Sequence, residues 1–192
     1  ITVSGNGTVS GTPRDAGLFS FSVKVTDAND LSSTATVQLG VRASAPTIES
    51  ASVSPVTAFT GSPVEFKANV QGVSGFQPKG TVFFKSGDTT LASAAVGADG
   101  SATVSVSSLS LGKYTVSAIF ISDDTNYSNV QKADVAVLDI VPAPKAATVS
   151  AVTSVPLTGG TSRIDGIDFV DVKSVTVGGE SVAFTVVSET EI

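Results

Sequence analysis

The chain has 192 residues, of which 41% are hydrophobic and 15% charged, and its formal net charge is −6. This apolar content excludes a disordered tail, and the length predicts one or two domains. With no Cys and no His, the chain has neither disulfides nor thiolate nucleophiles, and it lacks the side chain best suited to proton transfer near neutral pH. Its acidic balance argues against nucleic acid and anionic membrane surfaces as partners.

The first segment predicts a β-hairpin. From Phe19 to Val25, apolar and polar residues alternate with period two, and the same alternation runs from Ala35 to Val41. The polar residues 27–30 between them are turn formers. We therefore expect two antiparallel strands with one buried face.

The middle segment, which begins after a linker at residues 42–46, predicts a complete β-sandwich. Alternating runs centre on residues 64–70, 81–85, 102–106, 114–120 and 136–140, with turn-forming residues between them. About seven short strands in roughly 95 residues is typical of an immunoglobulin-like (Ig-like) fold.

A second linker, Val141–Pro144, is followed by strand-like residues 148–152, residues 173–177, the Gly178-Gly179 turn and residues 182–186. The predicted fold class is all-β, with tandem Ig-like sandwiches in series: a partial domain at 1–43, a complete domain at 44–142 and a partial domain at 143–192. No apolar run reaches the ~20 residues of a membrane span, so membrane insertion is not expected. The chain does not begin with Met, and we expect it to be part of a longer protein.

Each segment resembles a known family of Ig-like domains. Residues 9–13 and 16–28 resemble Ig repeats of the He-PIG type from large bacterial surface proteins. Residues 80–84, 91–92, 100–103 and 109–127 resemble the group 3 bacterial Ig-like (Big) domain. Residues 158–161, 164–169, 175–179 and 188–192 resemble an IPT/TIG domain, with its T-G-G-T and V-x-V-G-G motifs.

The resemblances imply a non-enzymatic structural or adhesive array in a large bacterial surface or phage virion protein, located outside the cell, on the cell surface or on the virion. Such an array would act as spacer, decoration or stalk, with neighbouring Ig-like domains of the same protein as its partners. The alternatives are a module that binds a surface glycan or a protein, and accessory domains of a larger secreted enzyme.

Two polar clusters are weak candidates for calcium, which prefers several oxygen ligands. One comprises Asp27, Asn29 and Asp30, and superficially matches the calcium motif of cadherins; the other comprises Asp123 and Asp124. Asp and Asn also form turns with their own side chains. We favour turns at both places and expect no cofactor.

Four aromatic residues have candidate roles. Tyr114 follows Leu111-Gly112-Lys113 at the start of a strand, which is the place of a tyrosine corner, where the hydroxyl bonds an upstream backbone group. Phe76, Phe83 and Tyr127 are the candidates for ligand contact, because stacking on a sugar or protein needs flat apolar area.

Catalysis within these residues is not expected. The carboxylates are scattered over turns and outward-facing strand positions, and no nucleophile-elbow or phosphate-loop spacing occurs. IPT domains also occur in DNA-binding proteins, but residues 143–192 carry only Lys145, Arg163 and Lys173 against six acidic residues, which argues against nucleic acid. Exposed strand edges of the partial domains would permit homo-oligomers or filaments if both termini are natural.

Overall fold

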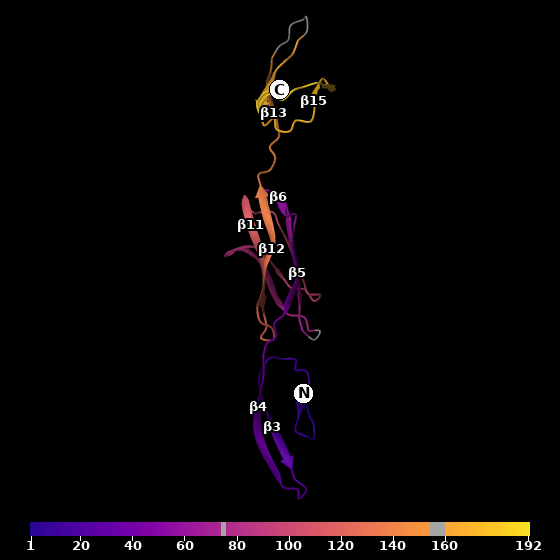
Figure 1. Cartoon of the computed structure of the whole chain (residues 1–192), viewed down its shortest axis with the longest axis vertical. Helices are drawn as coiled ribbons and strands as arrows, with labels where there is room; N and C mark the ends of the chain where they lie inside the picture. The colour runs from indigo at the N-terminus through magenta and orange to yellow at the C-terminus, as the bar shows by residue number, and fades with distance from the viewer. Residues whose placement is uncertain (74–75, 154–159) are drawn as a thin grey trace. The chain divides into compact units, whose positions relative to one another are not determined.

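A computed structural model describes residues 1–73, 76–153 and 160–192, and in these residues all regular structure is β-strand (Figure 1). The chain divides into two compact units, Ile1–Pro142 and Ala143–Ile192. The division falls in the second predicted linker. A separate domain boundary after Ala43 stays a prediction. In the described residues, no helix is long and apolar enough to cross a membrane.

The first segment contains the predicted hairpin. Strands β3 (Gly17–Thr26) and β4 (Ser32–Val41) pair antiparallel in continuous register, from Gly17 opposite Val41 to Thr26 opposite Ser32. Two short strands, β1 (Thr2–Val3) and β2 (Val9–Ser10), pair separately.

The expected buried face of this hairpin is only half formed. Phe21 and Val23 are half-buried, whereas Phe19 remains 42% exposed and Val25 66% exposed. In the described residues β3 and β4 form a two-stranded sheet, so no further strand continues it. A lone hairpin has too little surface to enclose its own apolar side chains.

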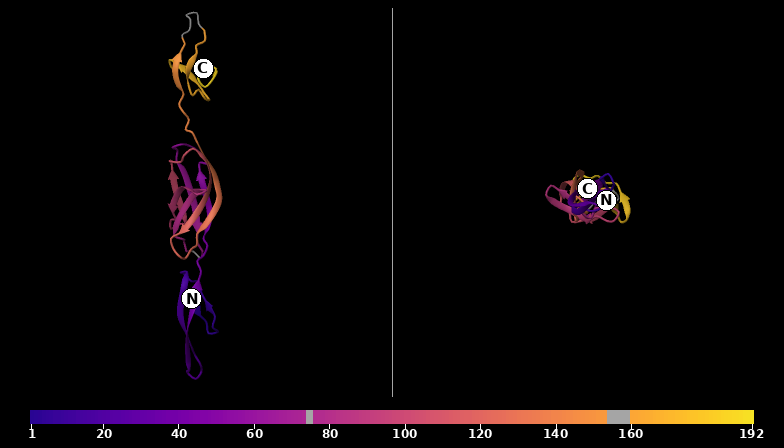
Figure 2. Two further views of the ribbon diagram at one scale, coloured as in Figure 1. Left: turned by 90° about the vertical axis from the view of Figure 1, so that its left-hand side faces the viewer. Right: turned by 90° about the horizontal axis from the view of Figure 1, so that it is seen from below.

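The middle segment is an Ig-like β-sandwich of two antiparallel-rich sheets (Figure 2). The smaller sheet has the order β10-β7-β5, and its strands are Ser101–Val106, Val64–Gln71 and Thr47–Ser54. The larger sheet has the order β6-β12-β11-β8-β9, and its strands are Thr57–Phe59, Val130–Val141, Gly112–Ser122, Gly80–Ser86 and Thr89–Ala95.

The core lies between these two sheets, because apolar residues alternate along their strands and face inward. Along β7, the apolar positions Val64, Phe66, Ala68 and Val70 are all buried, and the residues between them face outward or lie at the margin. The Phe66 ring packs against Phe84 of β8 with ring centroids 5.2 Å apart. Further fully buried side chains come from the larger sheet: Val82, Val116, Ala118, Phe120 and Leu138.

Strand β12 runs the length of the sandwich and defines its two poles. At the N-terminal pole, the linker residue Ser44 bridges to Tyr127, shortly before β12 begins: Ser44 N–H donates to the Asn126 carbonyl at 2.9 Å, and Ser128 N–H donates to the Ser44 carbonyl at 3.0 Å. At the C-terminal pole, Val141 ends β12 opposite Phe59. Twelve residues of strand span about 35 Å, so the chain enters and leaves this sandwich at opposite poles.

The C-terminal unit contains two small sheets. Strand β13 (Thr148–Val152) pairs with β14 (Ile164–Ile167), and β15 (Val175–Val177) pairs with β16 (Glu180–Val182) across the predicted Gly-Gly turn. Gly178 and Gly179 have φ values of 60° and 91°, which favour glycine. Residues Thr158 and Gly159 of the predicted T-G-G-T motif lie outside the described residues.

Candidate functional site

A groove opens at the N-terminal pole of the sandwich, with a volume of about 500 Å³. Three parts of the chain line it: the stretch before β3, the linker after β4, and the loops that follow β7 and β11 of the sandwich. Its polar and charged lining residues are Thr12, Arg14, Asp15, Arg42, Ser44, Gln77, Lys79, Asp124 and Asn126.

Asn126 joins the three parts. Its side-chain oxygen accepts a hydrogen bond from Ala16 N–H at 2.6 Å, its carbonyl accepts one from Ser44 N–H, and its own N–H donates to the Asp124 carboxylate at 2.8 Å. Its amide nitrogen also lies 3.5 Å from Asp15 Oδ1. The backbone and side chain of one residue thus join the three parts of the chain that line the groove.

Tyr127, predicted as an exposed ligand contact, is instead a buried structural residue with 7% exposure. Its hydroxyl donates to the Phe76 carbonyl at 2.6 Å and accepts from Val73 N–H at 3.3 Å. A buried tyrosine satisfies the hydrogen bonds of its hydroxyl in this way, and here the hydroxyl holds Val73 and Phe76 of the loop after β7. Gly72 lies against the same pair, because an added Cβ would clash with the Phe76 carbonyl oxygen.

Phe76, by contrast, is 44% exposed and lines the groove, in agreement with its predicted accessibility. Phe83 lies on β8 opposite Ile119 of β11 and Ser93 of β9, where it is half-exposed on the outer face of the larger sheet. It is not among the residues that line the groove. The structure therefore brings Phe76 and Tyr127 together and leaves Phe83 apart, and a ligand at any of them stays a prediction.

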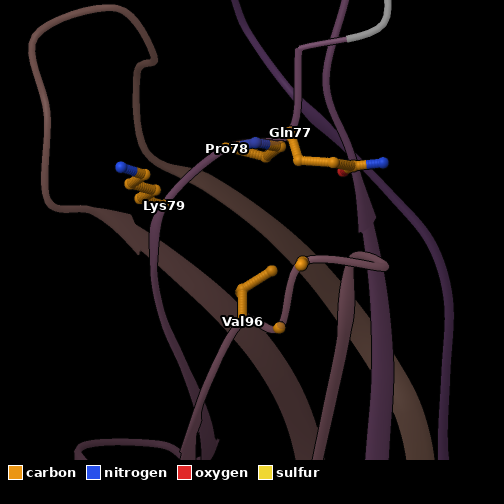
Figure 3. A pocket seen from close by; sticks show the side chains of 6 residues that line it. Gln77, Pro78, Lys79 and Val96 are labelled. Carbon is orange, nitrogen blue, oxygen red and sulfur yellow. The ribbon is translucent and has the colours of Figure 1, made fainter.

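A second hollow of about 430 Å³ lies beside the groove and shares Gln77 and Lys79 with it. Figure 3 shows that the side chains of Gln77 and Lys79 extend to opposite sides of Pro78, and that Val96 faces the hollow from below. Its polar groups do not converge on a common point, so it offers little beyond a shallow apolar surface.

In each predicted calcium cluster, one carboxylate oxygen is engaged in a turn. Asp27 Oδ1 accepts hydrogen bonds from Asn29 N–H at 2.8 Å and Leu31 N–H at 2.9 Å, and Asp30 has a φ of 63° in the same turn. Asp124 Oδ1 is occupied by Asn126, and Asp123 donates its N–H to the Lys79 carbonyl. Across residues 1–73, 76–153 and 160–192, no three acidic side chains converge as a metal site would require. The calcium alternative stays a prediction.

Two titratable groups elsewhere have shifted pKa values. Ser101, through its hydroxyl and then its N–H, donates to Asp99 Oδ1 and lowers the pKa of that carboxyl below its ordinary value. In the C-terminal unit, Asp165 and then Glu191 raise the pKa of Arg163. Both groups lie on the surface, so these contacts order local turns and create no reactive centre.

The middle of the chain matches a known protein family. Residues 50–138 match the bacterial Ig-like domain (group 3). This match confirms the predicted family for the middle segment, and the strands between β5 and β12 have the corresponding two-sheet arrangement. A comparison with curated proteins finds no match. The He-PIG and IPT/TIG resemblances of the flanking segments stay predictions.

Bacterial Ig-like domains of this group are generally non-catalytic modules, typically extracellular or surface-exposed. In the group 3 segment, Tyr114 lies where a tyrosine corner is expected. Its hydroxyl donates to the Ser110 carbonyl, four residues upstream, at 2.8 Å. The bond closes the connection that leads from β10 into β11.

The cations of the groove, Arg14, Arg42 and Lys79, were missed by the sequence reasoning. Arg14 and Lys79 are 65 positions apart, and neither lies in a recognisable motif. Arg42 stands in the linker, where a charged residue also serves solubility. Only the docking of Ser44 and Ala16 on the loop at Asn126 brings these side chains to one place.

Proposed function

We propose that this chain is a load-bearing spacer segment of an extracellular bacterial surface or virion protein. The observation that carries the proposal is the position of the chain ends of the sandwich. The chain enters at Ser44 beside Tyr127 and leaves at Val141, so a neighbour on each side attaches at a different pole. A module that adds length between its neighbours needs this arrangement.

The way in which the terminal strands pair supports the same proposal. Strand β6, near the start of the sandwich, runs parallel to β12, its last strand, with Thr57 opposite Asp139 and Val141 opposite Phe59. Asp139 N–H donates to the Val56 carbonyl at 2.8 Å, and Thr60 N–H donates to the Val141 carbonyl at 2.9 Å. When the two ends are pulled apart, these bonds share the load, because parallel strands slide along each other rather than peel.

The core needs no disulfide to account for its burial. The chain has no Cys, and the sandwich encloses seventeen buried apolar residues in one cluster. At about 25 cal/mol per Å² of apolar area removed from water, a core of this kind is the main source of stability. Such a domain keeps its fold in oxidising and reducing surroundings alike.

The test is to pull single molecules through their ends and compare two variants. Ala58→Pro removes a backbone donor from the parallel β6–β12 pair. Val104→Ala in β10 removes core volume outside that pair. Unfolding forces are recorded for both, and their equilibrium stabilities are measured alongside.

For each variant, the drop in unfolding force is divided by the drop in the free energy of unfolding. The spacer proposal predicts a larger ratio for Ala58→Pro than for Val104→Ala. Equal losses of force per unit of stability would show that the β6–β12 pair bears no particular load. In that case the sandwich would be a passive decoration rather than a load-bearing spacer.

A further inference from the structure

The groove at the N-terminal pole concentrates positive charge in an acidic chain. Three of the eleven Lys and Arg residues line it, although the net charge of the chain is −6. Within the described part of the chain, the ion pairs involve other cations, and Arg14, Arg42 and Lys79 form none. All three are exposed and available to a ligand.

The two carboxylates in the groove, Asp15 and Asp124, offset this charge only in part. Asp124 Oδ1 accepts the Asn126 N–H at 2.8 Å, and Asp15 Oδ1 faces the Asn126 amide nitrogen at 3.5 Å. A carboxylate keeps its charge when it accepts a hydrogen bond from a neutral N–H, so three cations against two carboxylates leave the groove with a net charge of +1, which favours an anion. A concave surface with one dominant sign of charge raises the local concentration of the opposite ion.

An aromatic ring stands in the same groove. Phe76 is 44% exposed, yet the backbone that bears it is held by the hydrogen bond from the Tyr127 hydroxyl to its carbonyl. An exposed ring on a fixed backbone offers a flat apolar face at low entropic cost. The amides of Gln77 and Asn126 line the groove beside it.

We propose that this groove binds a carboxylated glycan, such as a uronate-containing oligosaccharide. Guanidinium and ammonium groups bind the sugar carboxylates, the Phe76 ring packs on a sugar face, and the amides bond hydroxyl groups. A volume of about 500 Å³ suits a short oligosaccharide. A folded protein partner instead needs a broad surface, because stable interfaces bury about 800 Å² on each side.

The experiment measures binding of the 192-residue chain to trigalacturonate by calorimetry, at low salt and at high salt. Maltotriose, a neutral sugar of equal length, and tri-glutamate, a peptide of similar charge, are the comparison ligands. The variants Arg42→Gln, Lys79→Gln and Phe76→Ala alter the groove. Lys85→Gln and Lys24→Gln remove one cation from β8 and β3, outside the groove, and are the matched controls.

We expect trigalacturonate to bind, and high salt to weaken the binding. Loss of Arg42 or Lys79 should weaken it about tenfold, because a charge-assisted hydrogen bond is lost. The control variants should bind as the unaltered chain does. Phe76→Ala should lower the affinity without changing its dependence on salt. Arg14→Gln should weaken binding as well, because Arg14 is the third cation that lines the groove.

Three results would overturn the proposal: no binding of trigalacturonate, equal binding of maltotriose, or equal weakening by Lys85→Gln. Equal or tighter binding of tri-glutamate would assign the groove to an acidic peptide instead of a glycan. Thermal unfolding of each variant shows whether a lost affinity reflects a lost fold. The outcome is independent of the pulling experiment, since none of the substituted groove residues lies in the β6–β12 pair.

Discussion

Two tyrosines of the sandwich make the same kind of bond in different surroundings. Tyr114 donates to the Ser110 carbonyl at an accessible turn, and Tyr127 bonds both Phe76 and Val73 at a buried position. The sequence predicted the Tyr114 bond, because a tyrosine corner joins residues that are close together in the chain. The second joins residues 51 and 54 positions apart, and nothing in the sequence indicates it.

Replacing Tyr127 with Phe should destabilise the sandwich more than replacing Tyr114 with Phe. Tyr127→Phe leaves a Val73 N–H and a Phe76 carbonyl without a partner in a part-buried place, at a cost of about 1–3 kcal/mol. Tyr114→Phe removes one bond whose carbonyl partner can turn to water, and should cost about 1 kcal/mol. Urea unfolding of both variants measures the difference. The reverse order would mean that the loop after β7 contributes little to stability.

The Asp99 turn should respond to acid in a defined direction. Because Ser101 lowers the pKa of the Asp99 carboxyl in the folded state, the ionised form stabilises the turn. That contribution is present above the pKa of the unfolded chain and is lost as the pH falls through the lower folded pKa. In an NMR titration, Ser101→Ala should raise the Asp99 midpoint toward its ordinary value. An unchanged midpoint would contradict the assigned hydrogen bond.

Among the elements, β7 and β8 were predictable and β6 and β9 were not. Period-two alternation along β7 and β8 fixed which side chains face the core, because each strand has one buried face. Strand β6 has three residues and pairs in parallel with residues 82 positions later in the chain, so no local pattern predicts it. In β9, Leu91 and Ala92 are adjacent and both buried, and a register shift opposite Phe84 and Lys85 breaks the alternation.

Adjacent phenylalanines in β8 test which face of the strand carries stability. Phe84 is fully buried against Phe66, and Phe84→Ala should cost about 3–5 kcal/mol. Phe83 points to the outer face and is half-exposed, so Phe83→Ala should cost much less, about 1 kcal/mol. Chemical denaturation of the two variants gives both values. Similar costs would contradict the assignment of the two faces.

The first hairpin shows where alternation alone is insufficient. The pattern from Phe19 to Val25 correctly predicts β3 and its pairing with β4. It does not predict what covers the apolar face, because a covering sheet consists of other residues. Burial is therefore a property of the neighbours of a strand, and Phe19 remains partly exposed where the described chain provides none.

At the scale of the whole molecule, composition and linkers predicted the fold class and the division at Pro142. They did not predict the groove, which depends on Asn126 receiving hydrogen bonds from Ala16 and Ser44. Contacts of this kind join residues over 80 to 110 positions and use common side chains. A site formed by them leaves no motif in the sequence.

The central claim is that the sandwich bears load along β12 between opposite poles. Pulling one sandwich in two directions tests it most directly, and the absence of native Cys makes engineered attachment points unambiguous. One direction uses Ala43→Cys and Pro142→Cys, at the two poles. The other uses Ser108→Cys and Pro142→Cys, both near the C-terminal pole, where Gly112 lies opposite Ile140.

We predict a higher unfolding force between the poles, because that direction shears the β6–β12 pair, whereas the other peels β11 from β12 one bond at a time. Equal forces in the two directions, or a lower force between the poles, would contradict the account.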